Sequence, residues 1–186
     1  MESTMAIKPR VSVFIDAEYV ISSVKNLKNK PFGIEIPKGN IKWLNLANNA
    51  ARSGSLQRIY YYTSALNQNE NKKTYSDQEH YLEKLQNDGI VTRLGKMVKV
   101  KGIWMQKGVD IQMAIDIVTE ECDIAVLITG DSDFEPVVKK AQAKGKEIFL
   151  ITFFRYGGQT PKGFIDLCSY HDVIDYRAGQ NLGIWN

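Results

Sequence analysis

Cysteine and histidine are scarce in this chain, which has two residues of each type among 186. Cys122 and Cys168 lie far apart, and no CxxC motif or Cys/His cluster surrounds either one. This spacing argues against a disulfide framework and against a structural zinc site. His80 and His171 also lack the spacing of metal ligands, so we expect both on the surface or in helix packing.

Long apolar runs are also absent. Residues 1–10 contain no apolar segment of a secretory signal, and the longest apolar stretch, residues 148–154, is interrupted by Thr152. A membrane-spanning helix needs about 20 predominantly apolar residues, far more than this stretch offers. We therefore expect no membrane association and a cytoplasmic location. The chain also lacks a glycine-rich phosphate loop, which argues against a nucleotide-binding enzyme.

The chain also has no large excess of positive or negative charge, because its formal net charge is only +3. The distribution along the chain is more informative than this sum. Five basic and no acidic residues lie between Arg93 and Lys107, whereas eight acidic and no basic residues lie between Gly108 and Glu135. This pattern predicts a basic surface beside an acidic patch.

The composition, with 44% hydrophobic and 24% charged residues, is that of one soluble globular domain. Short apolar segments typical of strands alternate with helical patterns. The predicted strands are residues 11–15, 58–63, 89–93, 124–129, 147–152 and, at one edge, 172–176. This alternation predicts a doubly wound, mostly parallel sheet in a three-layer α/β/α fold. We expect one domain over residues 10–176, with residues 1–9 and 177–186 as loose tails.

Helix-start signals follow several of the predicted strands. Asn40 is expected to cap a helix that ends at Gly54. Two capping boxes, Ser76 with Glu79 and Ser132 with Glu135, predict two more helices.

Aspartates stand where two predicted strands end. Asp16 ends the first strand, while Asp131 and Asp133 follow the strand 124–129. In an open α/β sheet, ligands bind beyond the carboxyl ends of the strands where the strand order reverses. If these two strands flank that point, their carboxylates share one crevice.

Asp110 is a fourth candidate. At about 100° per residue, it falls within the apolar stripe formed by Met113, Ala114, Ile117 and Val118. Clustered carboxylates repel one another or take up protons, and a divalent cation removes this conflict. Hard oxygen ligands favour Mg²⁺ or Mn²⁺.

Each acid also has a simpler interpretation. Asp110, Asp131 or Asp133 could cap a helix, and Asp16 could be a turn residue. A solvated helix face accounts for four further acids: Asp116, Glu120, Glu121 and Asp123.

Three segments stand out together: Phe14 to Asp16, the KGVD block of Lys107 to Asp110 with Asp116 six residues later, and Thr129 to Phe134 followed by Pro136. They resemble the LabA-like NYN domains of the PIN-like nuclease superfamily. The resemblance covers about residues 10–176. It implies a PIN-like fold, metal-dependent RNA cleavage that leaves 5′-phosphate and 3′-hydroxyl ends, and metal-site carboxylates at Asp16, Asp110, Asp131 and Asp133. Where the family usually has Asn three residues after the first Asp, this chain has Tyr19. Glu18, Asp116 and Ser132 are secondary candidates for the site.

A basic hairpin precedes Asp110. Basic and apolar residues alternate over 96–101, and a turn at Gly102 leads to Trp104. Lys99, Lys101 and Lys107 are candidate phosphate-binding residues, with Trp104 as a stacking surface. Lysines that protect an exposed sheet edge are an equally good explanation. Tyr60 to Tyr62 are expected in the core and on the sheet face.

Three functions therefore remain open. The first is a metal-dependent endoribonuclease that acts on single-stranded RNA through the four aspartates, and the expected partner is RNA. The second, motivated by Tyr19, is a PIN-like RNA- or protein-binding module with little catalysis. The third is a Toprim-like phosphotransfer domain, in which Glu18, Asp131 and Asp133 would supply the acids. A homodimer is left open.

Overall fold

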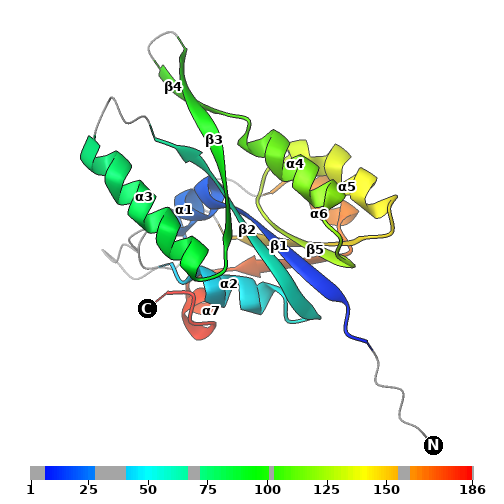
Figure 1. The fold of residues 1–186 in the computed structure, drawn as a ribbon. Helices are drawn as coiled ribbons and strands as arrows, with labels where there is room; N and C mark the ends of the chain where they lie inside the picture. The colour runs from blue at the N-terminus through cyan, green and yellow to red at the C-terminus, as the bar shows by residue number, and fades with distance from the viewer. Residues whose placement is uncertain (1–6, 28–40, 67–71, 101–102, 155–159, 186) are drawn as a thin grey trace, which may run out of the picture.

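A computed structural model describes residues 7–27, 41–66, 72–100, 103–154 and 160–185. They form one seven-stranded sheet in the order β4-β3-β2-β1-β5-β6-β7, with helices on both faces (Figure 1). The strands are β1 (Arg10–Asp16), β2 (Ser55–Ala65), β3 (Val91–Val100), β4 (Ile103–Lys107), β5 (Ile124–Ile128), β6 (Glu147–Phe153) and β7 (Tyr170–Ile174). The helices are α1 (Ala17–Lys25), α2 (Trp43–Ala50), α3 (Lys72–Asn87), α4 (Val109–Thr119), α5 (Glu135–Gln142), α6 (Lys162–Leu167) and α7 (Tyr176–Asn181), with a 3₁₀ turn η2 (Ser132–Phe134).

Six of the strands are parallel, and only β4 runs antiparallel to its neighbour β3. From β1 the chain winds outward through β2 and β3, and it then returns to the other side of β1 with β5. The strand order therefore reverses between β1 and β5. This arrangement confirms the predicted doubly wound, mostly parallel α/β fold.

Two apolar layers hold the helices on the sheet. One layer packs α1, α2, α3 and α7 against one face, and the other packs α4, α5 and α6 against the opposite face. All five residues of β5 are buried and apolar because helices cover both faces of this central strand. Each buried Ile, Val or Leu side chain of this strand contributes about 1.5–3 kcal/mol by leaving water.

Two predictions about helix starts need correction. Ser76 lies inside α3, which already begins at Lys72, so the first predicted capping box is absent. At the second, Asp131 caps the turn in place of Ser132, because its carboxylate accepts the Asp133 N–H. Asn40 lies outside the described residues, and α2 begins at Trp43 without a side-chain cap.

The expected loose tail after residue 176 is also wrong. Residues 176–181 form α7, capped by Asp175, and Trp185 is only 2% exposed. The ring of Trp185 lies against Gly179, where any Cβ would overlap it. The physical reason is that Ile184 and Trp185 complete the apolar layer over the sheet.

No helix in the described ranges combines the length and the apolar character that a bilayer crossing requires.

Candidate active site

The candidate site lies at the carboxyl edge of the sheet, between β1 and β5. These strands pair in parallel from Val11 with Ile124 to Ile15 with Ile128. Asp16 and Thr129 therefore leave the sheet side by side. The predicted position of the two aspartate segments, on either side of the strand reversal, matches this topology.

Asp16 is held by two hydrogen bonds. Its Oδ1 accepts the Tyr19 N–H at 3.0 Å, and its Oδ2 accepts the Thr129 hydroxyl at 3.0 Å. Burial, with smaller contributions from the nearby charges of Asp110 and Asp131, raises the pKa of Asp16 to about 6 even though these two bonds lower it. Ionisation of Asp16 is therefore less favourable in the folded protein than in the unfolded chain.

The second acidic segment is the turn after β5. Asp131 and Asp133 are exposed, and Oδ1 of Asp131 accepts the Asp133 N–H at 2.9 Å. The Asp131 N–H in turn donates to the Thr129 hydroxyl at 3.3 Å. The interpretation of Asp131 as a cap is therefore correct for η2, and Ser132 is the first residue of that turn.

Asp110 is in the first turn of α4, but the cap position belongs to Gly108, which has a φ of 86° and provides no side-chain cap. Met113 and Ile117 are buried as predicted, whereas Asp110, taken over all its atoms, is exposed. Its carboxyl is nevertheless partly covered, and this desolvation raises its pKa, with a further contribution from Asp131 and Asp133. Asp110 therefore belongs to the same electrostatic cluster.

The four aspartates do not form a ready cage of ligands. Across the described parts of the chain, no three side chains among His, Cys, Asp and Glu are grouped to hold a metal ion. The tight convergence expected from the sequence is therefore wrong for this structure. The reason lies in the contacts: Asp16 and Asp131 direct oxygens toward N–H and O–H donors.

The chemistry of the four aspartates nevertheless fits a divalent cation. They provide only hard oxygen donors, and the ion pairs of the described residues join Arg10, Arg52, Arg58 and Arg93 to other acids. These pairs therefore do not compensate the negative charge of the four aspartates. Desolvation and repulsion from neighbouring acids raise the pKa of both Asp16 and Asp110.

Thr129 and Tyr19 are the contributors that sequence reasoning missed. Thr129 is fully buried and connects Asp16 to the backbone of Asp131. A usable signal existed, because a hydroxyl residue directly follows an apolar strand and stands two positions before an aspartate. The departure at Tyr19 gave no indication of where its ring lies.

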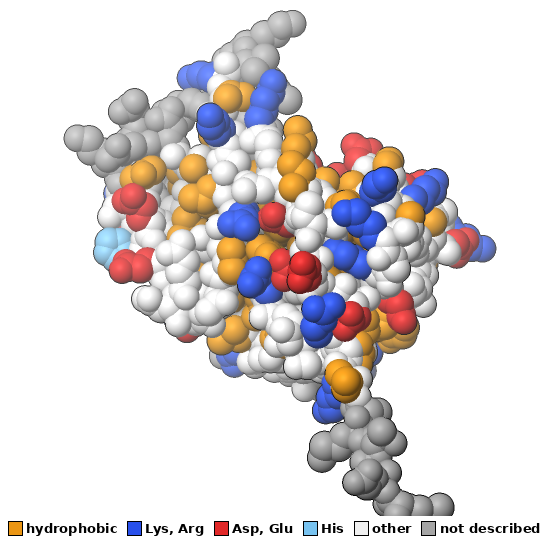
Figure 2. Space-filling view, turned by 45° about the vertical axis from the view of Figure 1, so that its right-hand side comes forward, with side chains coloured by type: hydrophobic (Ala, Val, Ile, Leu, Met, Phe, Trp, Pro, Cys, Tyr) orange, Lys and Arg blue, Asp and Glu red, His pale blue; other side chains and the backbone are white. Residues whose placement is uncertain are grey.

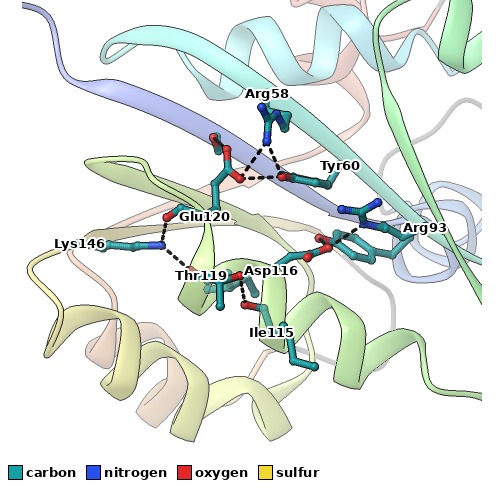
Figure 3. A network of polar contacts seen from close by, with 11 residues as sticks. Arg58, Tyr60, Arg93, Ile115, Asp116, Thr119, Glu120 and Lys146 are labelled. Carbon is teal, nitrogen blue, oxygen red and sulfur yellow. Dashed lines mark hydrogen bonds and ion pairs between the residues drawn. The ribbon is translucent and has the colours of Figure 1, made fainter.

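Asp116 and Glu120 do not form the expected solvated helix face. Asp116 accepts hydrogen bonds from the Tyr62 hydroxyl at 2.9 Å and from Arg93 Nε at 3.0 Å (Figure 3). Glu120 accepts the Tyr60 hydroxyl at 2.6 Å and pairs with Arg58. Both acids therefore fasten α4 to β2 and β3, which gives Asp116 a structural role apart from Asp110.

The tyrosines of β2 explain this outcome. α4 lies over polar tyrosine hydroxyls on the sheet, so the acids that face them are satisfied at the interface rather than by water. Asp123 instead pairs with Arg10 at 3.0 Å, and both side chains are about half exposed. Glu121 is exposed, so the expected solvated face holds for it.

The basic hairpin projects from the sheet beside α4, at the top of Figure 1. Lys96 pairs with Lys107 and Lys99 with Trp104 across β3 and β4, so the lysines lie on both faces of the ribbon. Lys96, Lys99 and Lys107 are exposed, while Lys101 lies outside the described residues. Figure 2 shows Lys and Arg side chains at this end of the molecule and across the α4–α5 face.

Gly95 fixes the base of the hairpin against α4. A Cβ at this position would lie 2.1 Å from Val109 Cγ2 and 2.8 Å from the Lys107 carbonyl oxygen. The bare backbone of β3 therefore lets the chain cross closely just before Asp110. This contact ties the basic hairpin to one of the four aspartates.

The remaining candidates lie as follows. Glu18 is exposed in the first turn of α1. His80 is exposed on α3, as expected. His171 is instead part of β7, where its Nε2 contacts the Thr152 hydroxyl at 2.8 Å and burial lowers its pKa. Tyr60, Tyr61 and Tyr62 are all buried on the sheet, as predicted.

The fold and the acidic edge define a class: a doubly wound α/β domain with carboxylates at the strand reversal. The model of the NYN domain family matches residues 10–175, so the chain belongs to the NYN domain family, a PIN-like nuclease family. Its members are generally nucleases that act on nucleic acids and typically use divalent metals.

A structural comparison agrees on the fold. The chain is similar to the crystal structure of a protein of unknown function, VPA0982, from Vibrio parahaemolyticus. The TM-score is 0.64 at 18% sequence identity, and the match covers 95% of this chain and 98% of that one. No curated protein matches the chain.

Proposed function

We propose that this protein is a LabA-like NYN endoribonuclease that hydrolyses phosphodiester bonds of single-stranded RNA with the help of Mg²⁺ or Mn²⁺. The observation that carries the proposal is the link between the two strand ends: Asp16 bonds to Thr129, Thr129 bonds to Asp131, and Asp110 and Asp131 lie near enough to raise the pKa of Asp16. Acids gathered at an electrostatic cost point to a functional site.

The four aspartates Asp16, Asp110, Asp131 and Asp133 would hold the cation. When bound, such an ion lowers the pKa of a water molecule and stabilises negative charge on the phosphate. Tyr19 N–H and the Thr129 hydroxyl orient the Asp16 carboxylate. One of the four acids orients the attacking water or accepts its proton.

The substrate would approach along the basic hairpin. Lys99 and Lys107 are exposed, and the base of the hairpin contacts the start of α4 at Gly95. Lysines bind phosphates along a single strand without sequence preference, and Trp104 and Lys101 are the further candidates for this surface.

The test is cleavage of an end-labelled single-stranded RNA in Mn²⁺ by the parent, Asp131→Asn and Asp123→Asn proteins. Asp131 follows β5 and Asp123 precedes it, so the two substitutions are chemically identical at opposite ends of one strand. We expect Asp131→Asn to lose at least about 100-fold in rate, because it removes a charged ligand, while Asp123→Asn keeps the parent rate. Equal rates for Asp131→Asn and the parent contradict the proposed site.

A binding module without catalysis is the second candidate. It is favoured by the absence of a ready ligand cage in the described residues and by Tyr19 at the family's Asn position. Such a protein would bind the RNA equally well in EDTA and leave it intact in Mn²⁺. A nuclease of the kind proposed instead cleaves the RNA and loses this activity in EDTA.

A further inference from the structure

Tyr19 spans the ends of three strands. It stands in the first turn of α1, directly after β1, and its N–H bonds to Asp16. Its hydroxyl accepts the backbone N–H of Phe153, the last residue of β6, at 3.0 Å. This bond is buried and joins residues 134 positions apart, and Tyr19 itself is only 9% exposed.

The ring of Tyr19 also braces the turn after β5. A Cβ at Gly130 would lie 2.5 Å from Tyr19 Cε2 and 3.0 Å from Cζ, so the ring or the turn would have to shift to admit one. Gly130 is not among the glycines with positive φ, so this close approach, rather than backbone conformation, requires glycine. The ring therefore lies against the backbone between Thr129 and Asp131.

We infer that Tyr19 is a positioning residue that sets the spacing between Asp16 and Asp131, and that Gly130 is its matched partner. This inference rests on the proposed nuclease function. Asp16 is bonded directly to the Tyr19 backbone, and the Asp131 turn is bounded by the Tyr19 ring. The hydroxyl bond to β6 keeps that ring in place. A smaller residue, such as the Asn usual in the family, would leave space beside Gly130 and an unpaired N–H at Phe153.

Tyr19→Phe tests the hydroxyl alone, because it keeps the ring. We measure Mn²⁺ affinity by calorimetry, kcat and KM for RNA cleavage, and the melting temperature. Outer-shell partners of metal ligands typically affect affinity or activity 10–100-fold. We therefore expect Mn²⁺ binding to weaken about 10-fold and kcat to fall about 10-fold, with KM within about 2-fold.

Tyr60→Phe is the matched control. It also removes a tyrosine hydroxyl bond, to Glu120, on the same sheet but away from the four aspartates. It should lower the melting temperature and leave Mn²⁺ affinity and kcat within about 2-fold of the parent. If Tyr19→Phe behaves like Tyr60→Phe, Tyr19 is merely structural and the inference is overturned.

A double-mutant cycle tests the pair. Gly130→Ala should weaken Mn²⁺ binding about 100-fold when Tyr19 is present. Combined with Tyr19→Asn, the same substitution should weaken binding by at most about 10-fold, because the two shortest contacts of the added Cβ, both with the Tyr19 ring, are gone. If Gly130→Ala alone does not fold, recovery of folding in the double variant demonstrates the same coupling between Tyr19 and Gly130. Additive effects, or two variants that both fail to fold, count against it.

Different results overturn the proposed function and the positioning role of Tyr19. A parent protein that neither binds Mn²⁺ nor cleaves RNA overturns the proposed function and the positioning role together. A parent protein that does both, with Tyr19→Phe unchanged, overturns the positioning role alone.

Discussion

Asp16→Asn should make the metal-free protein more stable at neutral pH while abolishing its activity. The carboxyl is buried at the strand reversal, and burial raises its pKa from the ordinary 3.8 to about 6. Folding therefore favours the protonated form, and the ionised form at neutral pH carries a cost. Asparagine has almost the same shape and removes the charge.

The magnitude follows from that difference in pKa. A gap of about two pH units corresponds to about 3 kcal/mol between the two protonation states. The stability that Asp16 contributes is complete below pH 3.8 and is lost as the pH rises through about 6. Because an amide does not titrate and makes weaker hydrogen bonds, we expect a net gain of about 1–3 kcal/mol for Asp16→Asn above pH 6, shrinking toward zero at pH 4.

The assay is urea unfolding in EDTA at several pH values between 4 and 8, with Asp123→Asn as the control. The hydrogen bonds from Arg10 lower the pKa of Asp123, so its contribution has the opposite sign and is lost as the pH falls. If Asp16→Asn is less stable than the parent at pH 7.5, or its effect does not change with pH, the reasoning about the site is refuted.

Three further predictions concern the surroundings of the site. Lys99→Gln and Lys107→Gln should together lower the slope of log RNA affinity against log salt by about 1.4, whereas Lys8→Gln, before β1, should leave it unchanged; equal slopes contradict the hairpin as a binding surface. Asp116→Ala should cost about 1–3 kcal/mol in denaturant unfolding because the Tyr62 hydroxyl loses its partner, with RNA cleavage retained by the folded fraction. Trp185→Ala should cost about 3–5 kcal/mol, and an unchanged unfolding midpoint would restore the idea of a loose tail.

The doubly wound α/β fold was predictable because its signals are local. The apolar run of β5 and the acids after it indicate a buried parallel strand that ends at a site, and helical phase correctly placed Met113 and Ile117 in the core. These patterns depend on short stretches of sequence and on general rules for α/β sheets.

The features that the sequence did not predict depend on contacts between distant segments. Asp116 and Glu120 appear solvent-facing by sequence, but tyrosines from β2 lie opposite them. Trp185 is buried only because Gly179 admits its ring. The distance between the carboxylates also depends on distant segments, because donors such as the Thr129 hydroxyl orient the carboxylate oxygens. Topology brings the acids to one edge, but it does not determine their final orientation.

The most direct measurement of the central claim is an anomalous difference map from crystals soaked in Mn²⁺. We expect a peak at the edge between β1 and β5, with oxygens of Asp16 and Asp131 at about 2.0–2.3 Å from it and Asp110 or Asp133 completing the shell, alone or through water. A fully soaked crystal with no peak there contradicts the proposed metal site. So does Mn²⁺ held elsewhere while the Asp16 and Asp131 carboxylates keep their present hydrogen bonds.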